Sequence, residues 1–391
     1  MTIPTPEAAI AEHAKADPGF FLSPRNPIAT RDQIDVQAKA IAMMQSPLVL
    51  QARGQAANRW RIIAGARLTA EAESRLDELV EEYCFCYALK AVNGDANYPR
   101  VTAGLYNPGH QWFGLTVPGS RGAGGDGPDQ NYSFLPIDYG GHFELRGQRL
   151  CPEPADTTYT LTGSLGFTMT LGNIEGRDLI TDPDGRFVIT ISPEPANGNP
   201  NHLQTAPNAR YVFVRECRSD WRQSPAIHRI VRTNAPTMPP LTDAQLEQRT
   251  AQFIVDDVCS MFWLSAYMQS LEANVMGPVI NSGAVGGLTS QRIGFARLKL
   301  DADHAFVIRV GGRDAPFRDI VAHDFWFRTF DYWRRTSNLN NSQTRLGADG
   351  AATYVVAMQD PGVHNWIDTA GFSETLLVHR WQGFPPGMTD A

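Results

Sequence analysis

Cysteine is scarce in this chain, and long apolar runs are absent. The five cysteines among 391 residues are an odd number at irregular spacing, which argues against the disulfide framework of an extracellular protein. The longest apolar stretch, Phe253 to Met268, contains Asp256 and Asp257 and is shorter than the roughly 20 residues of a membrane span. The N-terminal segment has neither the basic start nor the apolar core of a signal peptide. We therefore expect a soluble cytoplasmic protein with no membrane partner.

An excess of positive charge is also missing. The chain has 34 basic and 41 acidic residues and a formal net charge of −7, which disfavours adhesion to the phosphate backbone of nucleic acids. With 42% hydrophobic residues, the chain is long enough to bury a large core. We expect a small molecule as the partner and no nucleic acid, and the sequence leaves self-association into a homo-oligomer open.

Motifs for nucleotide cofactors are absent or lack their structural context. Gly122 to Gly127 match the pattern G-x-G-x-x-G, but Pro128 and Asp129 follow in place of a helix whose N-terminus could bind a pyrophosphate. A flexible loop is the simpler interpretation. The sequence contains neither a G-x-S-x-G elbow nor a P-loop. We expect no nicotinamide, zinc or iron, and no other cofactor.

His142 and Glu144 come nearest to a metal-ligand or acid/base pair. They are two positions apart on an expected strand and therefore face the same side. Neither H-x-H nor H-E-x-x-H accompanies them, whereas zinc and iron sites need three or four converging ligands. A structural pair is the simpler interpretation, and a metal-dependent enzyme using His142, Glu144 or the C-terminal histidines stays open.

The chain is expected to be mainly helical over residues 1–97. Between Thr69 and Asn93 the apolar residues recur at three- and four-residue steps, which is typical of a buried helical stripe, and Thr69 is a suitable N-cap. The stripe consists of Leu76, Leu79, Val80, Tyr83, Cys84 and Tyr87. Shorter helices are expected near 33–45 and 47–62.

Antiparallel strands are expected over residues 98–235. Segments rich in β-branched and aromatic residues are separated by turn signals such as Asp182-Pro183-Asp184-Gly185. The expected strands are Tyr132–Tyr139, His142–Arg146, Thr157–Leu161, Arg186–Ile191 and Tyr211–Glu216.

A linker and a long helix are expected over residues 236–290, before a C-terminal β domain at 291–391. Thr242 and Gln245 match a capping box, and the helix is expected to continue to about Asn274. The expected C-terminal strands are Ile293–Leu300, Ala305–Val310, Asp319–Phe327, Thr353–Met358 and Thr375–Trp381. The predicted fold class is α+β: a helical N-terminal segment, antiparallel sandwich-like or jelly-roll-like regions and one long connecting helix.

Polar and aromatic side chains are concentrated between His323 and Arg380. The alternation from His323 to Arg328 predicts a strand with neither face purely apolar. Two segments rich in Asn and Asp follow, at 331–341 and 360–371, and such loops on a β scaffold commonly carry functional residues. The same residue types build tight turns, so a purely structural role stays open.

The C-terminal pattern resembles a known family. D-Y-x-x-x-x-S-x-L-N followed by D-P-G-x-x-N-W-x-D-T-A-G resembles the bacterial domain of unknown function 1214 family. The matching residues are Asp331, Tyr332, Ser337, Leu339, Asn340, Asp360, Pro361, Gly362, Asn365, Trp366, Asp368 and Thr369. Upstream, Pro128 to Tyr132 and Asp220-Trp221 resemble the region that precedes this domain in longer members. The resemblance implies a β-sandwich-like C-terminal domain and no particular reaction.

These C-terminal residues lead to a functional prediction. We expect an acid/base enzyme, a lyase, isomerase or hydrolase, acting on a hydrophobic small molecule such as a terpenoid, steroid or aryl compound, with or without an anionic group. The candidate catalytic residues are His364, Asp368, Asp331 and Tyr332. The candidate substrate-binding residues are Trp326, Trp333, Trp366, Arg328, Arg334, Asn340 and Asn365. A non-catalytic protein that binds such a ligand is an alternative. The resembling family often has proline in place of His364, so Asp368, Asp331 and Tyr332 are the stronger candidates.

Overall fold

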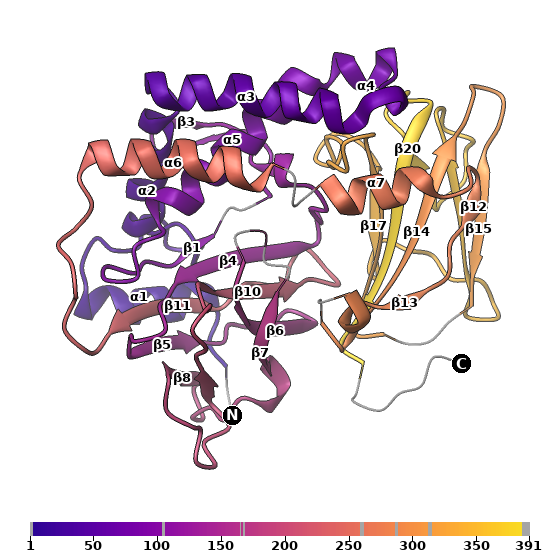
Figure 1. The fold of residues 1–391 in the computed structure, drawn as a ribbon. Helices are drawn as coiled ribbons and strands as arrows, with labels where there is room; N and C mark the ends of the chain where they lie inside the picture. The colour runs from indigo at the N-terminus through magenta and orange to yellow at the C-terminus, as the bar shows by residue number, and fades with distance from the viewer. Residues whose placement is uncertain are drawn as a thin grey trace.

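Helices lie across two β regions in this protein. The computed structural model describes residues 3–103, 106–164, 166, 169–258, 262–285, 288–311 and 315–384. Figure 1 shows α3, α4, α6 and α7 along one side of the molecule, with the two β regions beneath them. The predicted α+β class is confirmed. Most strand pairs are antiparallel as expected, whereas β8 (Arg186–Ser192) with β9 (His202–Gln204) and β18 (Ala352–Ala357) with β19 (Trp366–Asp368) are parallel.

Threonine residues cap most of the helices. The helices are α1 (Pro6–Ala16), α2 (Arg31–Met43), α3 (Pro47–Ala64), α4 (Ala70–Ser74), α5 (Leu76–Val92), α6 (Asp243–Asp257) and α7 (Phe262–Ser270). The side chain of Thr69 accepts a hydrogen bond from the backbone N–H of Ala72, and Thr242 forms the expected capping box with Gln245. The stretch expected to be one helix from Thr242 contains α6 and α7, and residues 259–261 between them lie outside the described part of the chain.

Helix α5 is buried on more than the expected stripe. All six stripe residues are buried, and so are Phe85, Cys86 and Leu89 on other sides of the helix. Helices α2, α3 and α6 and the 3₁₀ turn at Arg121–Ala123 all contact α5. Of these, α6 lies far away in the sequence, and its Ile254 carbonyl accepts a hydrogen bond from the Tyr83 hydroxyl at 2.9 Å. Apolar periodicity within a helix predicts one buried face. It does not predict burial of the other faces by segments that lie far away in the sequence.

Two sheets form the first β region. One has the order β1 (Thr102–Ala103), β4 (Gln130–Pro136), β10 (Tyr211–Cys217), β6 (Asp156–Thr162) and β7 (Thr170–Glu175). The other has the order β11 (Ile227–Arg232), β5 (Phe143–Gln148), β8 (Arg186–Ser192) and β9 (His202–Gln204). Leu135, Leu161 and Val212 of the first sheet share one core with Leu145 and Ile189 of the second. The two sheets therefore pack face to face, and β2 (His110–Trp112) and β3 (Leu115–Val117) form a separate hairpin.

The second β region repeats this arrangement in the C-terminal part. Its larger sheet contains β12 (Val275–Met276), β13 (Ile280–Asn281), β14 (Gln291–Lys299), β20 (Glu374–Gln382), β16 (Phe317–His323) and β17 (Asn338–Asn340). The smaller sheet contains β15 (Phe306–Val310), β18 (Ala352–Ala357) and β19 (Trp366–Asp368). Leu298, Ile320 and Leu377 of the larger sheet share a core with Tyr354 and Ile367 of the smaller one.

The strand predicted through Phe327 ends at His323. Asp324 turns the chain: its side chain accepts hydrogen bonds from the backbone N–H groups of Trp326 and Arg328, and its own N–H donates to the Arg328 carbonyl at 2.8 Å. Phe327 has φ of 67°. The alternation of polar and apolar residues there is therefore a property of a tight turn and not of a strand.

The glycine-rich segment is packed and does not behave as the flexible loop expected from its composition. A Cβ atom on Gly122 would lie 2.2 Å from the Tyr83 nitrogen and 2.5 Å from the Leu79 carbonyl oxygen, both on α5. The N–H of Gly125 donates to the Phe327 carbonyl at 2.7 Å. Glycine is needed here for the close approach of two backbones.

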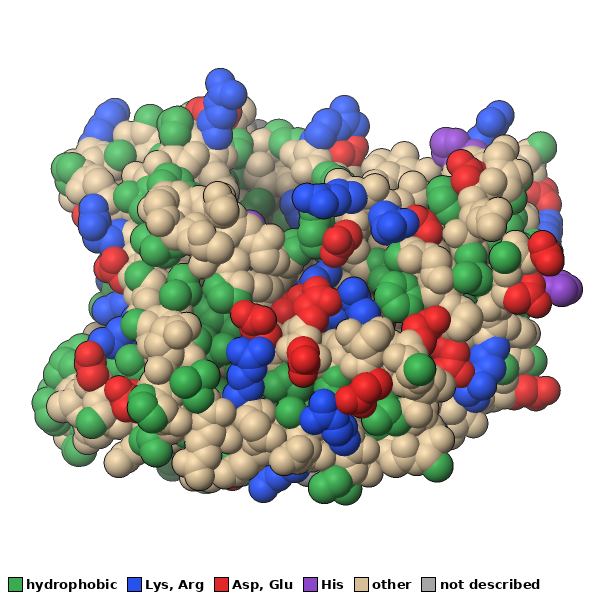
Figure 2. Space-filling model, turned by 90° about the horizontal axis from the view of Figure 1, so that it is seen from above, with side chains coloured by type: hydrophobic (Ala, Val, Ile, Leu, Met, Phe, Trp, Pro, Cys, Tyr) green, Lys and Arg blue, Asp and Glu red, His purple; other side chains and the backbone are tan. Residues whose placement is uncertain are grey.

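The outer surface of the helical layer is of mixed charge. Figure 2 shows this face, on which acidic and basic side chains are interspersed and hydrophobic side chains lie between them. None of the helices in the described ranges combines the length and the hydropathy of a membrane span.

Candidate functional site

The four candidate catalytic residues lie in different surroundings. Asp368 is buried, accepting hydrogen bonds from the Ala370 N–H at 2.7 Å and from Arg335 Nη1 at 3.0 Å. His364 is exposed, and its Nε2 donates to the Gln343 carbonyl at 3.2 Å. No hydrogen bond or ion pair among the described residues joins His364 to Asp368.

Asp331 and Tyr332 lie at the junction of the two β regions. Asp331 is 3.6 Å from the Arg121 guanidinium. The Tyr332 ring contacts the rings of Trp221 and Trp333 edge-on, with centroids 6.4 and 5.3 Å away. Burial raises the pKa of the Tyr332 hydroxyl, which keeps it protonated near neutral pH. Tyr332 also lines a cavity of about 260 Å³ together with Trp112.

Several candidate substrate-binding residues are held inside the protein. Trp326 is buried against the N-terminal helices and donates from Nε1 to the Ala72 carbonyl at 2.8 Å. Trp366 donates to the Ala357 carbonyl at 3.1 Å. Asn365 is also buried and hydrogen-bonds to the backbone. Trp333 and Arg334 are exposed. The structure does not bring these side chains together around one cavity.

Arg328 belongs to an ionic network, buried except for Glu78, that we call the junction network. Its members are Glu78, Glu82, Arg121, Asp324 and Arg328. Arg328 is fully buried and lies 3.1 Å from Asp324 and 3.3 Å from Glu82. Arg121 donates to both Glu82 oxygens, at 2.6 and 3.0 Å. The network joins α5 to the turn after β16, so it connects the helical layer to the C-terminal β region.

Residues that carry the family resemblance meet at Asp129. This buried carboxylate accepts hydrogen bonds from Trp221 Nε1 at 2.6 Å, from Asn340 Nδ2 at 2.8 Å and from Asn338 Nδ2 at 3.0 Å. Burial raises its pKa. These contacts connect the start of β4 to β17, and they give Asn340 a structural partner far away in the sequence.

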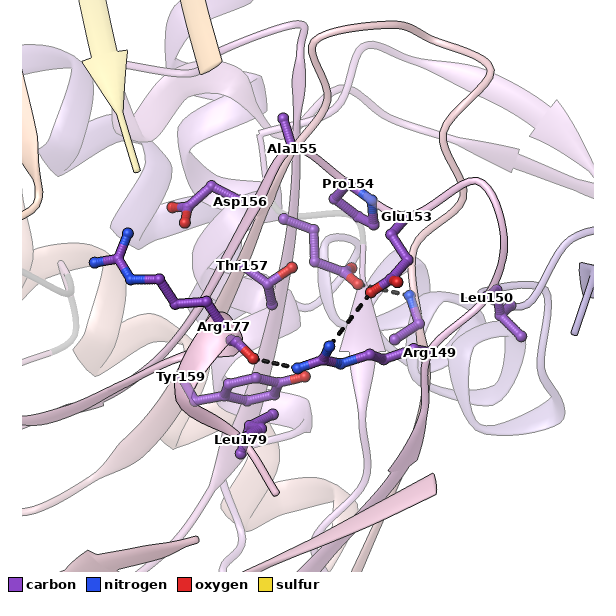
Figure 3. Close-up of a pocket in the computed structure, with 13 residues that line it drawn as sticks. Arg149, Leu150, Glu153, Pro154, Ala155, Asp156, Thr157, Tyr159, Arg177 and Leu179 are labelled. Atoms are coloured by element: carbon purple, nitrogen blue, oxygen red, sulfur yellow. Dashed lines mark hydrogen bonds and ion pairs between the residues drawn. The ribbon is translucent and has the colours of Figure 1, made fainter. Parts of the chain in front are cut away.

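A further pocket lies in the first β region and is lined mainly by polar and charged side chains. It has a volume of about 280 Å³, and its wall includes Arg149, Glu153, Thr157, Tyr159, Arg177 and Glu216. Figure 3 shows these side chains, which come from β6, β10 and the segments around β5 and β7. We call it the Glu216 pocket.

Glu216 is buried in this wall without a cation in contact. Its Oε1 accepts a hydrogen bond from the Ala226 N–H at 2.6 Å, and its Oε2 accepts one from Asn131 Nδ2 at 2.8 Å. None of the ion pairs in the described ranges includes it. Burial raises the pKa of the Glu216 carboxyl to about 7, so the group exchanges a proton near neutral pH.

Tyr159 and His228 form a hydrogen-bonded pair beside Glu216. The Tyr159 hydroxyl lies 3.1 Å from His228 Nε2. Burial lowers the pKa of His228 to about 4 and raises that of Tyr159, so both groups are neutral at pH 7. Figure 3 shows the Arg149 guanidinium near the Tyr159 ring. It donates to the Gly176 carbonyl and lies 3.6 Å from Glu153, so a cation lies near the neutral Tyr159 hydroxyl.

Asp156 lies nearby but on the other face of its sheet. It is paired with Cys217 across β6 and β10, whereas Glu216 is paired with Thr157, and directly opposed residues share a face. Asp156 accepts a hydrogen bond from Gln382 Nε2 at 2.7 Å, and burial raises its pKa to about 6. Figure 3 shows its carboxylate directed away from Tyr159. Asp156 and Glu216 both line the pocket, but their carboxyl groups have separate hydrogen-bond partners, Gln382 for Asp156 and Ala226 and Asn131 for Glu216.

The sequence contains one signal for this site. In the strand predicted at Tyr211–Glu216, the alternation puts Glu216 on the same face as Val212 and Val214, which lie in the core between the sheets. A carboxylate on the apolar face of a strand is unusual, because burying a charge is costly. Glu216 belongs to no recognisable motif in the sequence, and the sequence-based prediction does not include it.

His142 and Glu144 have separate partners. His142 Nε2 is 3.6 Å from Glu194, and Glu144 accepts hydrogen bonds from Arg146 at 2.7 and 2.9 Å. Across the described ranges, no group of three or more His, Cys, Asp or Glu side chains is placed to hold a metal ion.

Comparison with known proteins identifies the fold. The chain is similar to the crystal structure of an uncharacterized protein from Burkholderia cenocepacia, with a TM-score of 0.70, 23% identity and coverage of 88% of this chain and 95% of that one. The VPA0106 protein from Vibrio parahaemolyticus matches with a TM-score of 0.42, 11% identity and coverage of 78% and 94%. No family model and no curated protein matches the chain. The resemblance to the domain of unknown function 1214 family therefore stays a prediction.

Proposed function

We propose that this protein is an acid/base enzyme that acts on a small molecule bound in the Glu216 pocket. The observation that carries the proposal is the position of Glu216: a buried carboxyl group in a pocket wall, held only by amide N–H groups among the described residues. A catalytic acid or base needs a pKa near the working pH, and burial without a countercharge is the usual way to raise the pKa of a carboxyl group. As in the sequence-based expectation, the reaction is a proton-transfer reaction of the lyase, isomerase or hydrolase type.

The side chains around Glu216 could bind and orient a substrate. The neutral Tyr159 hydroxyl can hydrogen-bond a substrate oxygen, and its contact with His228 orients it. Arg149 and Arg177 also line the pocket, and each has a carboxylate nearby, Glu153 at 3.6 Å from Arg149 and Glu175 at 3.8 Å from Arg177. A substrate with a carboxylate or another anionic group can compete for these guanidinium groups. The lining contains the carboxyl groups of Glu153, Asp156 and Glu216 as well as these two arginines. It therefore suits a small polar substrate better than the hydrophobic compound, with or without an anionic group, expected from the C-terminal residues.

Hydrogen exchange from carbon tests the proposal across a range of possible substrates. Purified protein in D₂O is incubated with a panel of small 2-oxo, 3-oxo and 3-hydroxy acids, and proton NMR follows the loss of C–H signals. We expect exchange in at least one compound, and Glu216→Gln should slow it by on the order of a hundredfold or more. The rate should rise with pH up to about 7, because the ionised carboxylate is the base.

A matched control is Glu144→Gln, since Glu144 lies outside the pocket on β5 and pairs with Arg146. This variant should exchange protons as fast as the wild type. Equal rates for Glu216→Gln and the wild type would overturn the assignment of Glu216.

The non-catalytic binding protein is the second candidate. It is favoured by one observation: both oxygens of Glu216 already accept hydrogen bonds, which is sufficient for a structural role. A compound that protects the pocket from thermal unfolding but never exchanges its protons would support this alternative.

A further inference from the structure

A second concave surface lies in the C-terminal β region. Its volume is about 650 Å³, and it shares no lining residue with the Glu216 pocket. Its charged and apolar lining residues include Arg309, Arg345, Leu346, Asp349, Val363 and His364. We call this surface the C-terminal groove. It is bounded by β15, β18 and the turns at 345–351 and 363–365.

Positive charge exceeds negative charge in the groove. Arg309 forms an ion pair with Asp349, and this pair is exposed, with side-chain exposures of 61% and 57%. Arg345 is also exposed, and its guanidinium has no hydrogen bond or ion pair with the described residues. One cation is therefore left uncompensated, and an exposed pair such as Arg309–Asp349 is weak enough to be exchanged for a ligand.

The backbone that carries Arg345 is held in place by Asn365. The Asn365 side chain accepts a hydrogen bond from the Arg345 N–H at 2.8 Å and donates to the Arg345 carbonyl at 2.7 Å. It also donates to the Thr353 carbonyl at 3.0 Å. Asn365 is buried. A fixed backbone lowers the entropic cost of binding, because only the arginine side chain must become ordered.

Apolar side chains lie exposed in the same groove. Leu346 and Val363 are each 45% exposed. Single exposed apolar residues are ordinary, but here two of them line one concavity beside an uncompensated cation. Ligand sites commonly combine apolar walls with a few fixed polar groups.

We propose that the C-terminal groove binds a small amphipathic anion, a free carboxylate with a short hydrocarbon chain. Arg345 pairs with the carboxylate, and the chain lies against Leu346 and Val363. The Arg345 guanidinium offers two parallel N–H groups to a carboxylate, which is the strongest neutralising contact available to such a ligand. The site is independent of the proposed reaction at Glu216.

Titration calorimetry with octanoate, hexanoate and acetate tests the site on the full-length protein. Affinity should rise with chain length, by up to roughly fourfold for each methylene group that leaves water. Arg345→Gln should weaken octanoate binding at least tenfold, and Leu346→Ser should weaken octanoate more than acetate. Arg146→Gln, at an exposed arginine outside the groove, is the control and should bind octanoate like the wild type. Unchanged melting temperatures would show that the variants are folded.

Three results would overturn the proposal. The first is equal octanoate affinity in Arg345→Gln and the wild type. The second is equally tight binding of octyltrimethylammonium, since a cation of the same chain length should be rejected. The third is binding to vesicles of anionic phospholipid, lost in Arg345→Gln, without binding of free octanoate; that result would make the groove a membrane-surface contact. Loss of catalytic exchange in Glu216→Gln has no bearing on any of these results.

Discussion

Two buried glutamates of this protein differ in what surrounds their carboxylates. Glu82 is 4% exposed and lies within 3.3 Å of two guanidinium groups, those of Arg121 and Arg328. Glu216 is 1% exposed and is held by a backbone N–H and an asparagine side chain. Burial is similar, but only Glu82 has countercharges in contact.

The difference decides what each group can do. In the junction network the arginines offset the cost of removing a carboxylate from water, and the ion pairs connect α5 with the C-terminal region. In the Glu216 pocket no guanidinium is in contact, and burial raises the pKa to about 7 although two hydrogen bonds and the charge of Arg218 lower it. A buried carboxyl group is therefore a candidate for proton transfer when the opposing charges around it are too weak to offset its burial.

Removing a countercharge from the junction network should have the largest effect. Arg121→Ala leaves Glu82 with one guanidinium contact in place of two, and breaking a buried ion pair costs about 3–5 kcal/mol. Urea unfolding monitored by circular dichroism measures the free energy of unfolding.

Arg53→Ala is the matched control, since Arg53 pairs with Glu81 at 3.8 Å near the surface. Its cost should stay below about 1 kcal/mol. Similar values for Arg121→Ala and Arg53→Ala would mean that the junction network contributes little to stability.

Ionisation of Glu216 should have the next largest effect on the free energy of unfolding. Its pKa is about 7 in the folded protein and near 4.5 when exposed, so the folded state binds the proton more tightly. This stabilisation is fully present below about pH 4.5 and is lost as the pH rises through about 7. The change amounts to on the order of 3 kcal/mol.

The Glu216→Gln variant has no titratable group at this position. The difference between its unfolding free energies at about pH 5 and about pH 8 should therefore be smaller than the same difference in the wild type. Other buried carboxyl groups, such as Asp126 and Asp319, contribute equally to both proteins and cancel. Glu144→Gln should keep the wild-type difference. An unchanged pH dependence in Glu216→Gln would show that Glu216 has an ordinary pKa.

Replacing Asn365, a neutral buried side chain, should reduce the free energy of unfolding least of the three changes. Asn365→Ala removes three hydrogen bonds to backbone groups and should cost about 1–3 kcal/mol, because the unpaired groups remain partly buried. His364→Ala, at the exposed neighbouring position, should change stability by less than about 0.5 kcal/mol. Thermal melts of both variants test this order. A larger loss for His364→Ala would point to a role for the imidazole that its contact with Gln343 does not explain.

Local interactions explain the parts of the fold that the sequence predicted well. The caps at Thr69 and Thr242 involve residues three positions away, and the turn at Asp182 closes with the Gly185 N–H at 3.0 Å. The strands at Arg186–Ile191 and Tyr211–Glu216 lie within β8 and β10. These features depend on nearest neighbours, which a short window of sequence contains in full.

The candidate site was harder to predict from local patterns. The high density of polar residues between His323 and Arg380 predicted a functional site. In the structure, many of these residues form turns or contact segments that lie far away in the sequence. Trp326 packs against α4, and Asn340 bonds to Asp129. Whether Asp331, Tyr332, His364 and Asp368 also act on a substrate stays a prediction.

By itself, the sequence determined the fold class, the helix caps and the positions of ten of the twenty strands that the structure describes, because each follows mainly from residues close together in the chain. Tertiary structure alone decided which charges are compensated. Glu82 meets Arg328 across 246 residues, and Tyr159 meets His228 across 69. The pairing of β10 with β6 places Glu216 beside Thr157. The reason is physical: the pKa of a carboxyl group depends on the solvent and charges within a few ångströms, and these come from segments whose meeting no local pattern encodes.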